Sequence, residues 1–257
     1  MAKTETAQRS SGILMHPTSL PGPGGIGSLG AAAKAFVDSL AASGQQIWQL
    51  LPMVPTGSGD SPYSGTSAFG NEPMLIDLQW LVDKHWLTAQ ALAGDVPPAS
   101  DRIDFAAVRS YKYPRLRRAF ETFQTQAVAA DKAALATYAA AQAGWLPDFA
   151  LYTALKDVHN GLAWSDWEPA LVSRKPEALS AWRDKLAQDV AFHVFCQFVF
   201  DRQWRELRAH ATHVGVRVLG DIPIFVAYDS ADVWAHQELF HLDAKGQPTS
   251  VSGVPPD

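Results

Sequence analysis

The residues best placed to do chemistry in this chain are polar side chains in loops that follow short apolar runs. Asp221 is the main example, because it follows the β-branched run at residues 216–219 and Gly220. Pro223 prevents the run from continuing as a central strand. In parallel α/β folds the carboxyl ends of the strands face the ligand, so Asp221 is a candidate active-site carboxylate. A side chain that only caps a turn is the open alternative.

Two more candidates follow earlier apolar runs. His16 comes after residues 12–15, and Tyr63 lies with Ser61 in a Gly/Ser-rich loop after residues 47–51. A tyrosine at the tip of such a loop can stack on a sugar ring and hydrogen-bond it. A plain turn is the alternative for Tyr63, and we favour the functional interpretation. For His16, a hydrogen-bonded structural histidine at a strand end is at least as good an interpretation.

The elements that must position these side chains form a βαβ pattern. Residues 12–15 and 47–51 predict two strands, and residues 31–43 predict a helix with its apolar side chains on one face. This order implies a parallel pair of strands. With residues 216–219 as a third strand, all three candidate side chains are expected at one rim of the sheet.

The middle of the chain is predominantly helical in its apolar spacing. Helices are expected at 105–126, 131–143, 146–158 and 179–213, with a strand and a short helix at 73–81. This stretch is far longer than one crossover helix requires. We therefore expect a helical insertion between the second and third strands.

Composition excludes several classes of protein. The chain has 257 residues, of which 47% are apolar, so it can bury a sizeable core. Its net charge is −5 and it has no long Lys/Arg run, which argues against nucleic acid as a partner. Cys196 is the only cysteine, which suits the cytoplasm. The start, MAKTETAQRSSG, lacks the apolar segment of a signal peptide, and no apolar run reaches membrane-spanning length.

Other catalytic motifs are poorly supported. Residues 22–27 match G-x-G-x-x-G after a strand, which is typical of dinucleotide binding. However, Pro21 and Pro23 remove backbone N–H groups that would hold phosphate, and the next strand ends without an acidic residue. The histidines lack metal-ligand spacing, and Cys196 falls on an apolar helix face, where an inert core thiol is expected.

A series of ordered motifs resembles the 4-α-glucanotransferases, the amylomaltases or disproportionating enzymes of glycoside hydrolase family 77. The resemblance covers residues 10–257. The motifs are SGILMHPTSLPGPGGIG at 11–27, WQLLP at 48–52, GDSPY at 59–63, SAF at 67–69, LIDL at 75–78, WLPDFALY at 145–152, GDIPIFV at 220–226 and SGVPPD at 252–257.

The resemblance implies an α/β fold, a (β/α)₈ TIM-type barrel with helical insertions. It also implies transfer of α-1,4-glucan segments to the 4-OH of an acceptor through a covalent glycosyl-enzyme, which requires two carboxyl groups. The expected partners are maltooligosaccharides, starch- or glycogen-derived dextrins and glucose as acceptor. No metal or organic cofactor is expected, nor a nucleic acid or membrane partner.

This sequence departs from the family in length. Family members are about twice as long, and their catalytic carboxylates lie in motifs after the stretch printed here, so we expect an N-terminal fragment with three of the eight barrel strands. The expected organisation is a disordered start at 1–10, the first βαβ with rim loops at 11–71, a mainly helical insertion at 72–212, and the third strand with the start of an active-site loop at 213–257.

Seven residues carry over from the family as substrate-binding positions, and none carries over as catalytic. Asp221 resembles the family's aspartate on the third strand, and Tyr63 the loop tyrosine of the same subsite. The full set is Asp221, Tyr63, Ser61, His16, Gly253, Val254 and Pro255.

Two functions of different classes therefore compete. One is a transglycosylase, and the other is a non-catalytic glucan-binding or interaction module. They are separated by whether the reading frame continues with a second half that carries Asp and Glu. A nicotinamide-dependent oxidoreductase is a distant third.

Overall fold

The computed structural model describes residues 9–57, 59–98, 100–223, 225–243, 245–250 and 253. The chain divides into two compact units, which are described separately. The first unit contains Met1–Pro52, Met74–Arg115 and Asp201–Asp221, and the second contains Met53–Pro73, Leu116–Phe200 and Ile222–Asp257. The domain boundaries expected from the sequence remain predictions.

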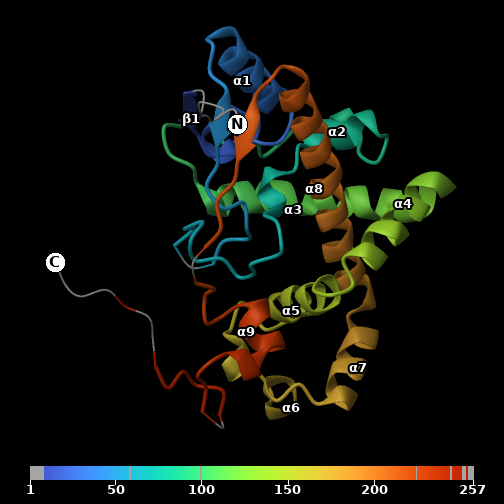
Figure 1. The fold of residues 1–257 in the computed structure, drawn as a ribbon. Helices are drawn as coiled ribbons and strands as arrows, with labels where there is room; N and C mark the ends of the chain where they lie inside the picture. The colour runs from blue at the N-terminus through green and yellow to red at the C-terminus, as the bar shows by residue number, and fades with distance from the viewer. Residues whose placement is uncertain are drawn as a thin grey trace, which may run out of the picture. The chain divides into compact units, whose positions relative to one another are not determined.

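Three short strands form a parallel sheet in the first unit. Strand β1 spans Gly12–Leu14, β2 spans Ile47–Gln49 and β3 spans Arg217–Leu219, in the spatial order β1-β2-β3. Helix α1, Ala31–Ala42, connects β1 to β2 and lies beside the strands (Figure 1). Gly44 follows the helix with a φ of 75°, a conformation that favours glycine. The predicted βαβ unit and third strand are confirmed, each element one or two residues shorter.

The central strand is fixed to its neighbours by a fully buried tryptophan. The indole N–H of Trp48 donates to the backbone oxygen of Met15 at 2.8 Å. The ring also meets Phe36 of α1 edge to face, with 5.4 Å between ring centroids. Trp48 therefore ties the sheet, its carboxyl edge and the covering helix together.

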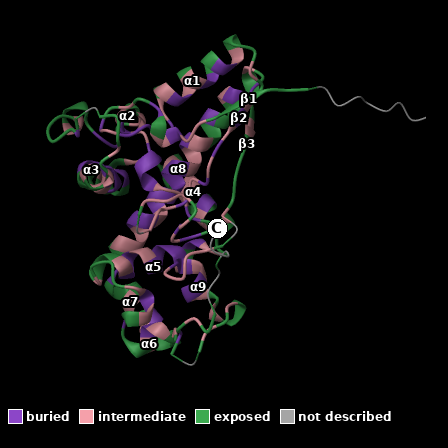
Figure 2. Ribbon diagram, turned by 90° about the vertical axis from the view of Figure 1, so that its left-hand side faces the viewer, coloured by how far each residue is buried: buried purple, intermediate pink, exposed green. Residues whose placement is uncertain are grey.

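The outer strands are apolar in sequence but exposed in the structure (Figure 2). Ile13, Leu14 and Leu219 are between 40% and 53% exposed. Strands with consecutive apolar residues are normally buried on both faces. The apolar side chains of Ile13, Leu14 and Leu219 are therefore suited to burial against additional strands or helices.

A segment expected to contain a strand does not form one, and this expectation was wrong. A 3-10 helix spans Pro73–Leu75 and α2 spans Leu78–Asp83. The ammonium group of Lys112, which is buried, donates to the backbone oxygens of Met74 and Ile76, so these carbonyls are occupied by a side chain. Asp77 then caps α2 by accepting from the N–H of Trp80.

The remaining described elements are mainly helices. Helices α3, Phe105–Gln126, and α8, Ala187–His213, contribute residues to both units. The others in the first unit are the 3-10 helices Pro17–Ser19 and Ala89–Leu92. The others in the second unit are α4 Ala129–Ala141, α5 Leu146–Val158, α6 Pro169–Val172, α7 Pro176–Lys185, α9 Ala231–Ala235 and the 3-10 helices Trp164–Asp166 and Gln237–Leu239. Among the helices described, none combines the length and hydropathy needed to cross a bilayer.

The single helix expected at 179–213 is two helices, so that prediction was wrong. Helix α7 ends at Lys185, the buried Leu186 is its C-cap, and α8 begins at Ala187. Basic residues occupy the last turn of α7 and Asp189 lies in the first turn of α8, as the helix dipoles favour. The apolar stripe continues across the break, so periodicity alone does not reveal it.

Aromatic side chains form the core of the second unit. Neighbouring ring centroids lie 5.1–6.2 Å apart in a cluster of Phe120, Phe123, Tyr138, Phe192, Phe195 and Phe198. Cys196 lies in α8, as Phe192, Phe195 and Phe198 do. Its side chain is buried, and this burial raises the pKa of its thiol. The predicted place of Cys196 in the core is confirmed, and a buried neutral thiol is expected to be a poor nucleophile.

Candidate functional site

The carboxyl edge of the sheet brings two of the predicted site residues to the same side of the first unit. Leu14, Gln49 and Leu219 form one row across the three strands. His16 and Asp221 each lie two residues beyond that row, in the segments that follow the two strands flanking β2. Tyr63 belongs to the second unit, so its convergence with this edge remains a prediction.

Asp221 lies where β3 has just ended. The N–H of Leu50 donates to the oxygen of Leu219 at 2.9 Å, which is the last contact of the ladder before Gly220. Asp221 is exposed beyond it. A carboxylate in this position can accept hydrogen bonds from a ligand held over the strand ends.

Both ring nitrogens of His16 are engaged within the protein. Nδ1 lies 2.7 Å from the hydroxyl oxygen of Thr18, and Nε2 lies 3.3 Å from the backbone oxygen of Pro52. His16 also caps the 3-10 helix Pro17–Ser19. Burial lowers the pKa of His16, and the hydrogen bond to Pro52 opposes this only in part. These contacts favour the structural interpretation, in which a neutral His16 joins the ends of β1 and β2.

The lowered pKa of His16 predicts a loss of stability in mild acid. The unfolded chain takes up a proton near pH 6.5 while the folded chain resists it, so the contribution is present above that pH and is lost as the pH falls below it. We expect the unfolding free energy to fall more between about pH 7.5 and about pH 5.5 in the wild type than in His16→Asn. Denaturant titrations of the complete protein at both pH values test this, and equal falls in the wild type and His16→Asn would contradict it.

A short turn presents Tyr63 in the second unit. Thr56 and Gly65 form an isolated antiparallel bridge, and the N–H of Gly57 donates to the oxygen of Ser64. The hydroxyl oxygen of Ser61 accepts from the N–H of Tyr63 at 3.3 Å. Tyr63 is 50% exposed at this turn. Ser61 therefore shapes the turn, and half of the Tyr63 side chain is exposed there.

The base of this loop is held by polar side chains. The Glu72 carboxylate accepts from the N–H of Thr56 at 3.1 Å. The buried amide of Gln197, on α8, accepts from the N–H of Asn71 and donates to its backbone oxygen, both at 2.8 Å. Tyr63 is thus carried on an anchored loop, which lowers the entropy lost when it binds a ligand.

The last predicted site residues are only partly described. Gly253 is exposed, whereas Val254 and Pro255 lie outside the described residues. Among the described side chains, no cluster of three or more His, Cys, Asp or Glu is arranged to hold a metal ion.

A pocket of about 290 Å³ in the second unit contains none of the predicted site residues. Phe69, Trp145 and Asp232 are among its lining residues, and sequence reasoning did not nominate them. The sequence feature that could have indicated this pocket is Phe69, a large aromatic residue in a loop of small and polar residues.

Comparison with known proteins identifies the relatives of this chain. A family model described as 4-alpha-glucanotransferase matches residues 15–257. The 4-alpha-glucanotransferase of Thermus thermophilus is 46% identical over 97% of this chain and 49% of its own length, and that of Synechocystis is 44% identical over 97% and 50%. The amylomaltase of Streptococcus agalactiae, solved with acarbose, matches with a TM-score of 0.93 at 36% identity, over 97% of this chain and 50% of its own.

These matches establish a mixed α/β fold like that of amylomaltase, with the three parallel strands described above. The chain spans about half the length of the curated relatives that it matches. Because the family model covers nearly all of the sequence, the chain belongs to the 4-alpha-glucanotransferase family, glycoside hydrolase family 77.

Proposed function

We propose that the protein containing this chain transfers α-1,4-glucan segments from a donor to the 4-OH of an acceptor glucan or glucose. The observation that carries the proposal is 46% identity to a 4-alpha-glucanotransferase across 97% of the chain. The mechanism would be a retaining double displacement, in which one carboxylate attacks the anomeric carbon and another carboxyl group protonates the leaving oxygen. The acceptor 4-OH then gives its proton to the acid/base carboxylate while its oxygen attacks the anomeric carbon. This breaks the glycosyl–enzyme ester bond and regenerates both carboxyl groups, so no net proton or electron is consumed.

In this proposal the present chain supplies one wall of the glucan site. Asp221 accepts hydrogen bonds from sugar hydroxyls at the end of β3, and Tyr63 stacks on a sugar ring while Ser61 holds its turn. The proposal also assigns contacts with the glucan to Gly253, Val254 and Pro255. His16 supports the sheet edge, and no metal or organic cofactor takes part.

The proposal includes a complete (β/α)₈ barrel around the sheet. The apolar side chains of Ile13, Leu14 and Leu219 support this, because further strands and the barrel interior would bury them. The substrates proposed are maltooligosaccharides and starch- or glycogen-derived dextrins, supported by the acarbose complex of the Streptococcus agalactiae amylomaltase. The single buried thiol, Cys196, fits the cytoplasm as the compartment.

Disproportionation of maltotriose tests this function. Two molecules of maltotriose should give glucose and maltopentaose, and longer products should follow, when the complete protein is incubated with maltotriose and the products are separated by chromatography. Maltose and glucose without longer products would indicate hydrolysis. Glucan binding with no reaction would favour the alternative, a non-catalytic glucan-binding module.

Substitution of Tyr63 tests its role as a stacking residue. Tyr63→Ala should raise KM for maltotriose by about tenfold, which corresponds to the roughly 1.4 kcal/mol of an aromatic contact. Tyr63→Phe keeps the ring face and should raise KM less. Steady-state kinetics of the three proteins measure this, and equal KM values would make Tyr63 an ordinary turn residue.

A further inference from the structure

A loop of the second unit carries an exposed aromatic residue, and the backbone of this loop is held by several hydrogen bonds. Phe69 is 60% exposed, although its backbone is fixed. The hydroxyl oxygen of Ser67 accepts from the N–H groups of Phe69 and Gly70, at 3.1 and 3.0 Å. A side chain at Gly70 would collide with the ring of Phe149, so the chain can pass there only as glycine. These contacts therefore hold the backbone that carries Phe69 in one conformation.

The same loop is fixed to the start of α9. The N–H of Ala231 donates to the oxygen of Thr66 at 2.8 Å, and Asp232 accepts from the N–H of Ala68 at 2.9 Å. One hydrogen bond uses only part of the acceptor capacity of a carboxylate. Asp232 can therefore hold the loop and still accept from hydroxyl groups of a ligand.

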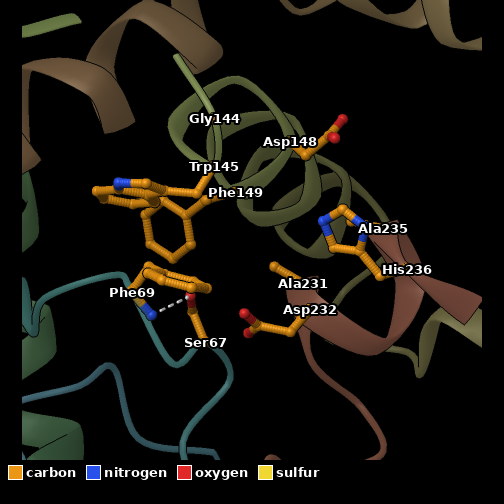
Figure 3. Close-up of a pocket in the computed structure, with 10 residues that line it drawn as sticks. All are labelled: Ser67, Phe69, Gly144, Trp145, Asp148, Phe149, Ala231, Asp232, Ala235 and His236. Carbon is orange, nitrogen blue, oxygen red and sulfur yellow. Dashed lines mark hydrogen bonds between the residues drawn. The ribbon is translucent and has the colours of Figure 1, made fainter. Parts of the chain in front are cut away.

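The resulting pocket has an aromatic side and a polar side. Phe69 stacks on Trp145 at the start of α5, with 6.2 Å between centroids and 21° between planes. Figure 3 shows the rings of Phe69, Trp145 and Phe149 gathered on one side, His236 on the other, and the carboxylate of Asp232 beside Phe69. The second carboxylate, Asp148, is already paired with two arginines, Arg174 and Arg183.

This pattern matches the chemistry of a pyranose ring. One face of such a ring carries C–H groups that pack on an aromatic surface, while its hydroxyls donate to carboxylates. A concave site with aromatic walls and a few polar groups is typical of small-ligand binding. An apolar ligand would leave Asp232 without the hydroxyl donors that a sugar offers.

We propose that the pocket framed by Phe69, Trp145 and Asp232 binds a glucosyl unit of an α-1,4-glucan. The proposal takes its ligand class from the proposed function and adds a binding site whose lining includes neither the residues assigned to the sheet edge nor Tyr63 and Ser61. A glucan bound here would be held by the second unit through contacts separate from those residues.

Fluorine NMR of the complete protein labelled with 5-fluorotryptophan tests this site. Trp145 is assigned from the signal missing in Trp145→Phe, and maltoheptaose is then titrated. We expect the Trp145 signal to shift in the wild type, and the apparent Kd at this signal to rise at least fivefold in Phe69→Ala and in Asp232→Asn. Asparagine can still accept from the N–H of Ala68, so the second variant removes the charge and keeps the loop.

Leu162→Ala is the matched control, because Leu162 is also exposed, at 52%, in the second unit but does not line the pocket. It should leave the Trp145 titration unchanged. A Trp145 signal that stays still at saturating maltoheptaose, or that moves equally in Phe69→Ala and Leu162→Ala, overturns the proposal. The titration needs no turnover. A shifted signal without maltotriose disproportionation would therefore overturn only the proposed function, and active transfer with an unmoved signal would overturn only this site.

Discussion

Residues 1–257 expressed alone are expected to transfer no glucan from maltotriose. Retaining transfer needs a nucleophilic carboxylate and an acid/base carboxyl group about 5–5.5 Å apart across the scissile bond. The family resemblance assigns neither role to a residue of this sequence, and Asp221 alone cannot perform both. Chromatography of the products after prolonged incubation measures the activity, with the complete protein as the positive control.

The same chain is also expected to fold poorly by itself. Ile13, Leu14 and Leu219 remain in contact with water, and β3 has a free ladder edge among the described strands. We expect a helical far-UV signal, binding of an apolar-surface dye and association that increases with protein concentration. A monomeric, cooperatively melting chain that disproportionates maltotriose would contradict both expectations.

Asp221→Asn in the complete protein should reduce kcat/KM for maltotriose by about 10- to 150-fold. The reason is loss of a charge-assisted hydrogen bond to sugar, worth roughly 1.5–3 kcal/mol. The change keeps the size of the side chain, and Asp221 is exposed at the end of β3, so the thermal midpoint should not change. Steady-state kinetics and thermal melting, measured on the same preparation, test the two parts.

Asp95→Asn provides the matched control for Asp221→Asn. Asp95 is another exposed aspartate of the first unit, in a turn with a φ of 50° that asparagine adopts readily. The Asp95→Asn substitution removes one negative charge at a position that does not follow a strand, so it should leave kcat/KM unchanged. If both variants retain wild-type activity, Asp221 only caps its turn. If both lose activity equally, the effect is one of overall charge.

The sequence by itself determined the elements whose signals are local. The apolar runs predicted all three strands, and α1 and α5 were found within one residue of their predicted bounds, because helical periodicity and end signals such as Gly44 lie within a few residues of each other. Long ordered motifs also determined the family. Each of these conclusions depends on residues that are neighbours in the chain.

Only the tertiary structure decided which distant groups meet. The break at Leu186 lies inside a continuous apolar stripe, so it becomes visible only when backbone geometry is known. Both nitrogens of His16 are engaged, one by Pro52, 36 residues away, and these contacts favour a structural role over a ligand contact. The pocket at Phe69 depends on the hydrogen bond between Ala68 and Asp232, which are 164 residues apart in the sequence. No local sequence pattern predicts this contact, because only the packing of distant segments brings the two residues together.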